Sequence, residues 1–553
     1  MKTDSALHHQ APLWAIWANP IVRRYARSRM RPRALGLSLL ITLMIAGFLF
    51  FVIRQIGIYQ AELSIRDAHR MPIIPLLFFQ GFILFVLGSG QTAAGMTAEA
   101  DEGVIDYQRL TPMTPIAKVA GYLFGLPIRE YATFLATMPF TLWAFWRGEV
   151  PLHIGLQLYG VFMIAGVLYH LTGLVAGTVL KNRRWAFLSS MGLVFALYTV
   201  VPQASKLGLV YFKYVTIEPV VRECFPHLVN STIRAGAQFM ENRDPAAQFF
   251  NLNFPQSVFT AGTLLFLIGV MVVMLWRRWH RAESHLMGKA GATGLFAWIQ
   301  LMLLGNALPL IWPSGGVFPS RGARLFQLPG DDWSPSAEET LVMSGIYGLV
   351  TLMILCLMTA LITPDRTGQI RGWRRTRKLG RPRLSFQSDP ATSFPWVFAM
   401  AAIGSGGWFW FTKKLVESVW FGTTDMPIAI LPVFFLVTAV GGFGFHALLE
   451  GKGKRAAGLA VILIGIAPLL VGVTVGATGE ALAPLALWIS GCSPVAGPIY
   501  AVLTFLPLSN LPPDFERTIP RAFWFWQGVG LLWACNLAIK LRRGRIKIAE
   551  STL

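Results

Sequence analysis

The sequence has 553 residues, of which 54% are hydrophobic and only 14% are charged, and its formal net charge is +21. Because soluble domains are nearer about one quarter charged, this composition excludes a chain built mainly from soluble domains. The positive charge does not indicate nucleic-acid binding, since the basic residues lie in short clusters at the ends of apolar runs. The four cysteines and nine histidines show no metal-ligand or disulfide spacing, so no metal site is expected.

Apolar runs recur along the whole chain and predict membrane-spanning helices, because a bilayer core about 30 Å thick needs roughly 20 apolar residues per helix. The runs do not alternate as barrel strands do, so helices are the expected spanning structure. We therefore predict an all-α polytopic membrane protein with about 12 transmembrane helices. The predicted spans are 34–53, 72–96, 120–144, 152–180, 185–205, 256–279, 293–313, 340–362, 395–412, 425–449, 457–477 and 521–541.

Residues 1–33 precede the first predicted span and form an expected cytoplasmic amphipathic segment. Apolar and aromatic side chains between Leu13 and Tyr25 are followed by arginines up to Arg33. Tryptophan and arginine both favour the membrane interface, so we expect a helix that lies in the interface and leads into the first span. A simple positively charged flank that sets the topology is the alternative. This polar segment is longer than the short basic region that begins a signal peptide. The first span is therefore expected to act as a membrane anchor that is not removed by cleavage.

The segment after the second predicted span, residues 97–117, is acidic although its expected location is cytoplasmic, where basic residues are usual. Its carboxylates are Glu99, Asp101, Glu102 and Asp106. Apolar side chains up to Leu110 lie among them, and Pro112 ends the local helix because it disfavours helical geometry in Thr111. A short helix of this kind is suited to docking onto another protein, and a solvated loop is the alternative. Catalysis is not expected, since nothing nearby buries the carboxylates or supplies a nucleophile.

The order of these features resembles a known family. An amphipathic segment with Asn19-Pro20, two spans, and Glu102-Gly103 leading to Arg109-Leu110-Thr111-Pro112-Met113-Thr114-Pro115 look like the permease subunits of ATP-binding-cassette (ABC) exporters of the type-2 fold. The resemblance covers residues 12–145 by motif and 146–280 by topology only. In the second half, Thr363-Pro364-Asp365-Arg366 follows the corresponding span but lacks the acidic helix.

The resemblance implies a coupling site for a separate cytoplasmic ATPase subunit. The residues expected to contact that partner are Glu99, Asp101, Glu102, Asp106, Arg109, Leu110, Thr111 and Pro112. It also implies re-entrant helices between the fifth and sixth spans of a unit. The sequence contains no GxxxxGK[S/T] phosphate-binding loop, so ATP is expected on the partner and no cofactor is expected in this chain.

Arg129 and Glu130 lie inside the third predicted span. A charge at the centre of a bilayer costs about 2.5–3.5 kcal/mol on insertion scales, so the two residues are a candidate intramembrane polar site. The alternative is that the span begins late and the pair lies near its cytoplasmic boundary.

The apolar stretch 481–507 is broken by glycine and proline between residues 491 and 498. With a cytoplasmic N-terminus, 32 of the 48 Lys and Arg residues fall in cytoplasmic segments, as the positive-inside rule requires. A single crossing by 481–507 would place the basic cluster 540–547 outside, so we predict a re-entrant hairpin and two cytoplasmic termini. The spans then form two six-helix units, 34–281 and 282–553, with repeated hydropathy and charge. An accidental count of twelve is the alternative.

The sequence therefore predicts a multi-pass permease of the plasma (bacterial inner) membrane that works with an ABC-type ATPase and is not itself an enzyme. If only the first half is a permease unit, a second copy of the chain is also a required partner. The alternatives are an ion-coupled secondary transporter, which would use Arg129 and Glu130, and a membrane scaffold or enzyme without transport. The sequence names no substrate.

Overall fold

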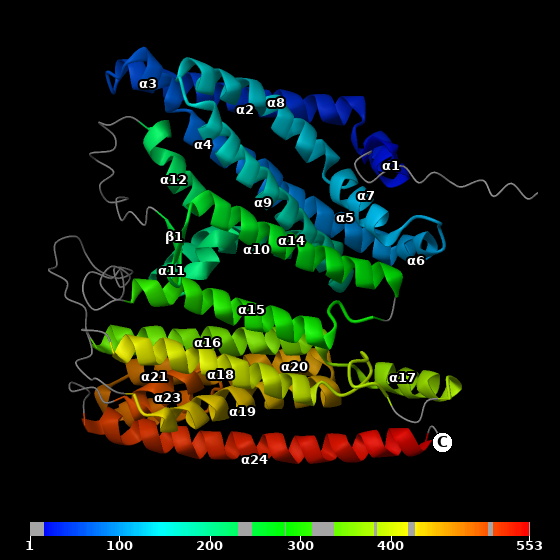
Figure 1. Cartoon of the computed structure of the whole chain (residues 1–553), viewed down its shortest axis with the longest axis vertical. Coiled ribbons are helices and arrows are strands. Elements are labelled where there is room, and N and C mark those ends of the chain that lie inside the picture. Colours follow the sequence, from blue (N-terminus) through cyan, green and yellow to red (C-terminus); the bar gives the residue numbers. More distant parts are fainter. Residues whose placement is uncertain are drawn as a thin grey trace, which may run out of the picture. The chain divides into compact units, whose positions relative to one another are not determined.

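The computed structural model describes residues 16–229, 246–281, 284–311, 337–380, 384–417, 426–506 and 513–551. Most of this described chain is helical, and β1 (Ala247–Phe249) and β2 (Leu252–Phe254) form a short two-stranded sheet (Figure 1). Ten of the described helices are long and apolar enough to cross a membrane. These helices confirm the prediction of a helical polytopic membrane protein.

The ten candidate spans are Pro32–Tyr59, Ile65–Asp101, Leu152–Val179, Arg183–Ser205, Gln256–His280, Lys289–Leu310, Leu341–Ile362, Ile428–Lys452, Lys454–Ala477 and Pro513–Lys547. The remaining predicted spans, 120–144 and 395–412, are helical but fall outside this set. The first is divided near Pro127, and the second contains glycines and tryptophans that lower its mean hydropathy. The predicted span ends at residues 313 and 425 lie outside the described residues.

The internal contacts of the chain divide it into two units. Unit 1 comprises Met1–Pro202, Phe212–Ala247 and Asn253–Ala282, and unit 2 comprises Gln203–Tyr211, Gln248–Leu252 and Glu283–Leu553. Unit 1 therefore carries the acidic segment and the pair Arg129–Glu130, whereas unit 2 carries the broken stretch 481–507.

Unit 1 is organised around the pair α5 (Ser89–Asp101) and α9 (Leu152–Val179), which pack along their length. A Cβ atom added at Gly177 would lie 2.6 Å from the carbonyl oxygen of Ala93, so glycine permits this close approach of the two helices. The other elements with most of their length in unit 1 are η1 (Ile16–Ala18), α1 (Pro20–Arg29), α2 (Pro32–Tyr59), α3 (Ile65–Arg70), α4 (Ile73–Gly81), η2 (Phe82–Gly88), α6 (Val104–Arg109), α7 (Pro115–Gly125), α8 (Ile128–Arg147), α10 (Arg183–Thr199), α12 (Glu218–Leu228) and α14 (Gln256–His280). Short α11 (Val201–Lys206) and η3 (Val210–Val215) connect α10 to α12.

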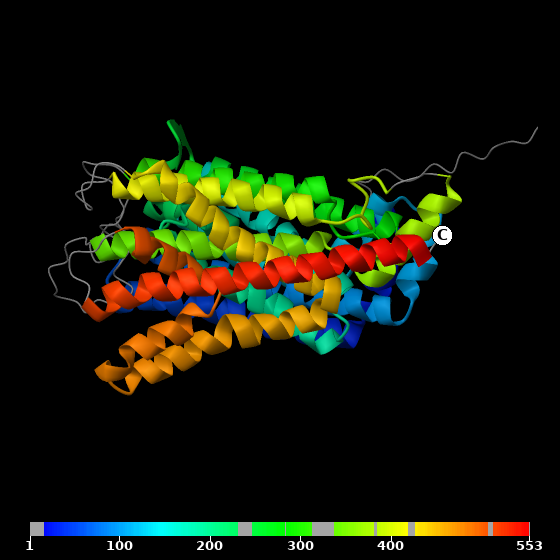
Figure 2. The ribbon, with the colours of Figure 1, turned by 90° about the horizontal axis from the view of Figure 1, so that it is seen from below.

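Unit 2 has a core formed by α16 (Ala337–Ile362), α18 (Phe394–Val416) and α19 (Leu431–Lys452). In this core the buried ring of Trp408 stacks on Phe434 at a centroid distance of 3.7 Å. Its elements are α15 (Lys289–Ala307), η5 (Leu308–Leu310), α16 (Ala337–Ile362), α17 (Arg366–Lys378), α18 (Phe394–Val416), η6 (Ile428–Ile430), α19 (Leu431–Lys452), α20 (Lys454–Ala460), η7 (Val461–Ile466), α21 (Ala467–Ala477), η8 (Glu480–Leu482), α22 (Ala483–Gly491), α23 (Gly497–Phe505) and α24 (Pro513–Ser551). Figure 2 shows α24, in red, as one long helix beside the shorter orange helices.

The broken stretch forms two short helices, α22 and α23, of nine residues each. At 1.5 Å per residue each is about 14 Å long, or about half of a bilayer core. The hydroxyl of Tyr500 donates to the carbonyl oxygen of Leu487 at 2.7 Å, so the two helices lie against each other. In the turn between them, buried Ser493 donates to the carbonyl oxygen of Gly465 at 2.5 Å. The irregular backbone is therefore held inside unit 2.

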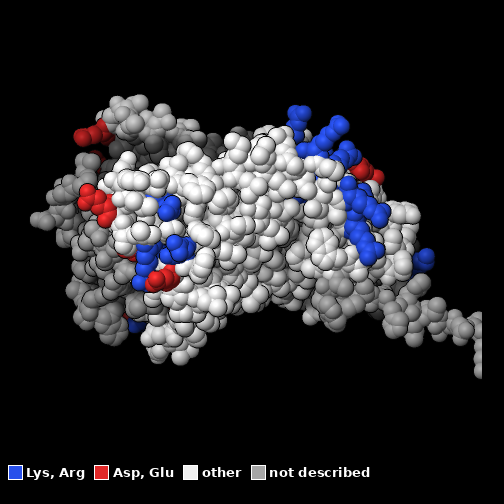
Figure 3. All heavy atoms as spheres, turned by 90° about the horizontal axis from the view of Figure 1, so that it is seen from above, with Lys and Arg blue, Asp and Glu red and all other residues white. Residues whose placement is uncertain are grey.

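The charged side chains on the face shown in Figure 3 gather at its two ends. A broad band without charged residues separates these ends. This distribution is typical of a surface that faces lipid in its middle and water at its ends.

Candidate functional site

The acidic segment 97–117 contains the end of α5, the short helix α6 and the start of α7. Gly103 turns the chain between α5 and α6 with a φ of +71°, a left-handed conformation that favours glycine. Beyond the turn, Tyr107 is 72% exposed and Leu110 is 83% exposed. Exposed aromatic and aliphatic side chains that lie together mark surfaces that bind another protein or a membrane.

Polar residues predicted from the sequence surround these two side chains. Asp101, Glu102, Asp106 and Pro112 are exposed, and Arg109 and Thr111 are partly buried. The structure therefore brings the predicted contact residues from Asp101 to Pro112 together on one short stretch. We call this stretch, residues 101–112, the α6 surface.

The underside of α6 is attached to two neighbouring helices of unit 1. Arg109 forms an ion pair with Asp106, and it also donates to the carbonyl oxygen of Arg278 in α14 at 3.2 Å. Lys118, buried in α7, donates to the carbonyl oxygens of Gln108 at 2.6 Å and Thr111 at 3.4 Å. Burial and, to a smaller extent, the nearby charge of Arg109 lower the pKa of Lys118. These bonds fix the position of α6 relative to α7 and α14.

Proline and threonine then set the start of α7. The hydroxyl of Thr114 accepts a hydrogen bond from the amide of Ala117 at 3.3 Å, and Pro115 occupies the first helical position. Threonine is favourable directly before a helix, because its hydroxyl accepts a hydrogen bond from a free amide of the first turn. Proline is favourable in the first turn, because it has no amide hydrogen that would need an acceptor there. The Thr-Pro-x-x-Pro run thus ends α6 and begins α7 within a few residues.

Glu99 differs from the other predicted contact residues because it is only 5% exposed. Arg24 donates to both of its carboxylate oxygens, at 2.8 and 3.2 Å. The hydroxyls of Tyr25 and Tyr122 donate to it at 2.6 and 3.1 Å. Burial and the negative charge of Glu99 raise the pKa of Tyr25. Glu99 therefore joins α1, α5 and α7 inside the chain, whereas the other predicted contact residues are exposed or partly buried.

The predicted amphipathic helix at the N-terminus is present as α1, but its apolar side packs on the protein. Ile21, Val22 and Tyr25 are buried. The side-chain amide of Asn19 donates to the carbonyl oxygen of Ala117 at 2.7 Å. The sequence could not show this contact, because it joins residues 98 positions apart. Leu13 lies outside the described residues.

The candidate polar pair Arg129–Glu130 lies in the first turn of α8, directly after the break at Pro127. Glu130 is 4% exposed and accepts from Arg129 at 3.2 Å. A carboxylate in the first turn of a helix interacts favourably with the helix dipole. The second oxygen, Oε2, accepts no hydrogen bond from the described residues. The pair is therefore at a helix start and not in the middle of a continuous span.

Two polar clusters inside unit 1 were missed by the sequence reasoning. In one, buried Gln80 donates to the hydroxyls of Thr137 and Thr141 at 2.8 and 2.9 Å. In the other, His170 contacts the hydroxyl of Tyr131 and the carbonyl oxygen of Leu84, each at 2.8 Å. Leu84 lies in η2, a π-helical segment, and such segments free carbonyl oxygens from the regular helix pattern. A lone glutamine or histidine within an apolar run was the available signal.

Comparison of the chain with known protein families, with curated proteins and with solved structures finds no match. The α6 surface and the residues that attach it to unit 1 are therefore the features from which a function can be inferred. Those residues connect an exposed patch to α1, α5, α7 and α14.

Proposed function

We propose that this chain is the membrane-spanning permease component of an ATP-driven exporter and works with a separate cytoplasmic ABC-type ATPase. The observation that carries the proposal is the α6 surface: exposed Tyr107 and Leu110 lie among exposed carboxylates on a base of partly buried hydrogen bonds. An apolar centre with a polar rim is the usual anatomy of a protein-binding surface. The ATP and its chemistry belong to the partner.

The proposed coupling works through the base of α6. A partner that moves on binding ATP would displace α6, and Lys118 and Arg109 would pass the displacement to α7 and α14. Glu99 would carry it on to α1. Such a contact favours one arrangement of the spans only if the partner binds that arrangement more tightly. Export then follows from a shift between inward-open and outward-open populations.

The proposed topology has twelve spans and a re-entrant hairpin in the plasma (bacterial inner) membrane. In this topology α8 and α18 add to the ten candidate spans. The short helices α22 and α23 enter and leave the membrane on the same side, since each is about half a bilayer core in length. Both termini are then cytoplasmic, with the basic end of α24 on the side favoured by the positive-inside rule. If only the first unit acts as a permease, a second copy completes the pathway.

Charge reversal on the α6 surface tests the proposal. The tagged full chain is purified in mild detergent from its native cells, and bound proteins are identified by mass spectrometry. We expect an ABC-type ATPase in stoichiometric amount, reduced at least about tenfold when Glu102→Lys and Asp106→Lys are combined, because like charges that replace favourable contacts cost several kcal/mol. Glu480→Lys, at an exposed acid in unit 2, is the matched control. ATPase retention that survives the double reversal would refute the coupling site.

The unpaired oxygen of buried Glu130 favours a second candidate function, an ion-coupled secondary transporter. Buried carboxylates in membrane proteins commonly hold protons or ions on a transport path. In that case the chain purifies without an ATPase, and an imposed proton or sodium gradient drives uptake of radiolabelled candidate substrates into proteoliposomes. Glu130→Gln would abolish this flux and leave the melting temperature nearly unchanged. If the flux does not depend on the imposed gradient, the chain is not an ion-coupled transporter.

A further inference from the structure

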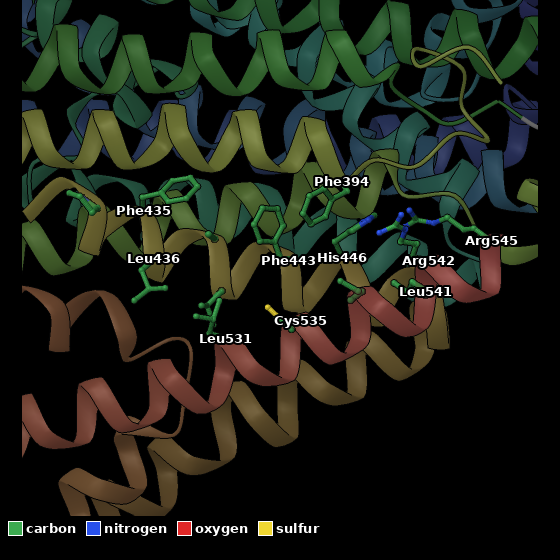
Figure 4. A pocket seen from close by; sticks show the side chains of 16 residues that line it. Phe394, Phe435, Leu436, Phe443, His446, Leu531, Cys535, Leu541, Arg542 and Arg545 are labelled. Carbon is green, nitrogen blue, oxygen red and sulfur yellow. The ribbon is translucent and has the colours of Figure 1, made fainter. Parts of the chain in front are cut away.

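A groove of about 500 Å³ runs along α19 and α24 in unit 2 (Figure 4). Most of its lining is apolar, including Phe435, Phe443 and Leu531. One end differs, because His446, Arg542 and Arg545 gather there. Figure 4 shows these three basic side chains beyond Phe443, at the C-terminal end of α24. The groove therefore has a long apolar part and a cationic mouth.

The length of the groove matches one leaflet of a bilayer. Its lining on α19 extends from Pro432 to Ala447, which is about 22 Å at 1.5 Å per residue. Half of a bilayer, with its headgroup layer included, is also about 20–22 Å. A chain that lies along the groove with one end at the mouth would therefore extend from the headgroup layer to the bilayer centre.

The charges at the mouth leave one arginine for a ligand. Arg545 donates twice to the carboxylate of buried Glu450, at 2.5 Å for each bond, and Gln369 donates to the same carboxylate at 2.7 Å. Glu450 therefore neutralises Arg545 and holds it in place. Arg542 is exposed and has no carboxylate partner among the described residues. Its guanidinium group is free to bind an anion such as a phosphate.

We propose that this groove binds one acyl chain of an anionic phospholipid and that Arg542 binds the phosphate of its headgroup. The lipid belongs to the leaflet next to the C-terminal end of α24. A helix about 10 Å wide would occupy roughly 1,700 Å³ over the same length, so the groove could take only one ridge of a helix. A single acyl chain can lie within it entirely. This lipid site is independent of the proposed exporter function.

Lipid retention by the full chain tests the proposal. The protein is placed in nanodiscs that contain equal amounts of phosphatidylglycerol and phosphatidylcholine, and retained lipids are counted by native mass spectrometry. We expect preferential retention of phosphatidylglycerol. Arg542→Gln should reduce this preference about fivefold, because one basic residue near a membrane surface contributes about 1 kcal/mol to anionic lipid binding. Arg543→Gln, at the adjacent exposed arginine outside the groove, should leave the preference intact.

A second pair of variants tests the apolar part. Ala538→Trp would fill the groove and reduce retention of both lipids, whereas Leu532→Trp lies on an exposed part of α24 outside the groove and should have no effect. Ala538→Leu gives the same test if the tryptophan variant does not elute as a folded protein. Equal effects of Arg542→Gln and Arg543→Gln would overturn the proposal. The proposal would also be overturned if inorganic phosphate displaced the bound lipid, or if native mass spectrometry showed dimers of the chain in place of bound lipid.

Discussion

Replacement of Glu99 by glutamine should release α1 from unit 1. Glutamine keeps the size of the side chain but removes the charge that accepts from Tyr25 and Tyr122. A hydrogen bond to a charged group contributes about 1.5–3 kcal/mol. Arg24 is half exposed, so its ion pair with Glu99 contributes little to this free energy, below about 1 kcal/mol. Because glutamine still offers one acceptor, we expect a net loss of about 3 kcal/mol in the free energy that holds α1 in place.

Limited proteolysis measures this loss. Trypsin cuts after the arginines of α1 only when that helix opens, and the cutting rate follows the open population when opening is fast. A loss of about 3 kcal/mol raises that population roughly 150-fold. Glu102→Gln is the matched control, because Glu102 is an exposed carboxylate three residues along the chain. If Glu99→Gln raises cleavage within α1 by less than about threefold, the carboxylate cluster does not hold the helix.

Three further changes have defined outcomes. Gly103→Val adds about 1–2 kcal/mol of strain at a positive φ, so ATPase co-purification should fall in the pull-down, and an unchanged yield would contradict the role of this turn. Glu450→Gln leaves Arg545 without its carboxylate and should lower the free energy of unfolding by about 3–5 kcal/mol. This loss is measured as a lower melting temperature by tryptophan fluorescence, and a shift no larger than that of Glu480→Gln would contradict it. Leu110→Ala should weaken ATPase retention but not melting, and equal losses of both would indicate a structural role.

The sequence predicted the helical membrane fold and the position of α6 because both depend on local patterns. Apolar runs identify spans, and the Thr-Pro-x-x-Pro run sets a helix end and a helix start within a few residues. The break before α8 had a signal too, since Pro127 interrupts the predicted span 120–144. The apolar residues on both sides of Pro127 nevertheless form one run, so the hydropathy pattern predicts a single span there.

The burial of Glu99 could not be predicted from local patterns. Its partners Arg24 and Tyr25 lie 75 and 74 residues away in the sequence. In the sequence alone, Glu99 has the same acidic surroundings as Glu102, which is exposed. Only the packing of α1 on α5 and α7 distinguishes buried Glu99 from exposed Glu102. The groove beside α24 was missed for the same reason, since its walls come from helices about 100 residues apart.

The bonds beneath α6 have a consequence for how this protein can change over evolutionary time. Lys118 and Arg109 reach the backbone oxygens of Gln108, Thr111 and Arg278 and not their side chains. Backbone oxygens are present whatever residue occupies a position. The outward side chains of α6 can therefore be exchanged while the attachment to α7 and α14 persists. In the proposed exporter, a few surface substitutions on α6 would thus be enough to fit the same membrane chain to a different ATPase subunit.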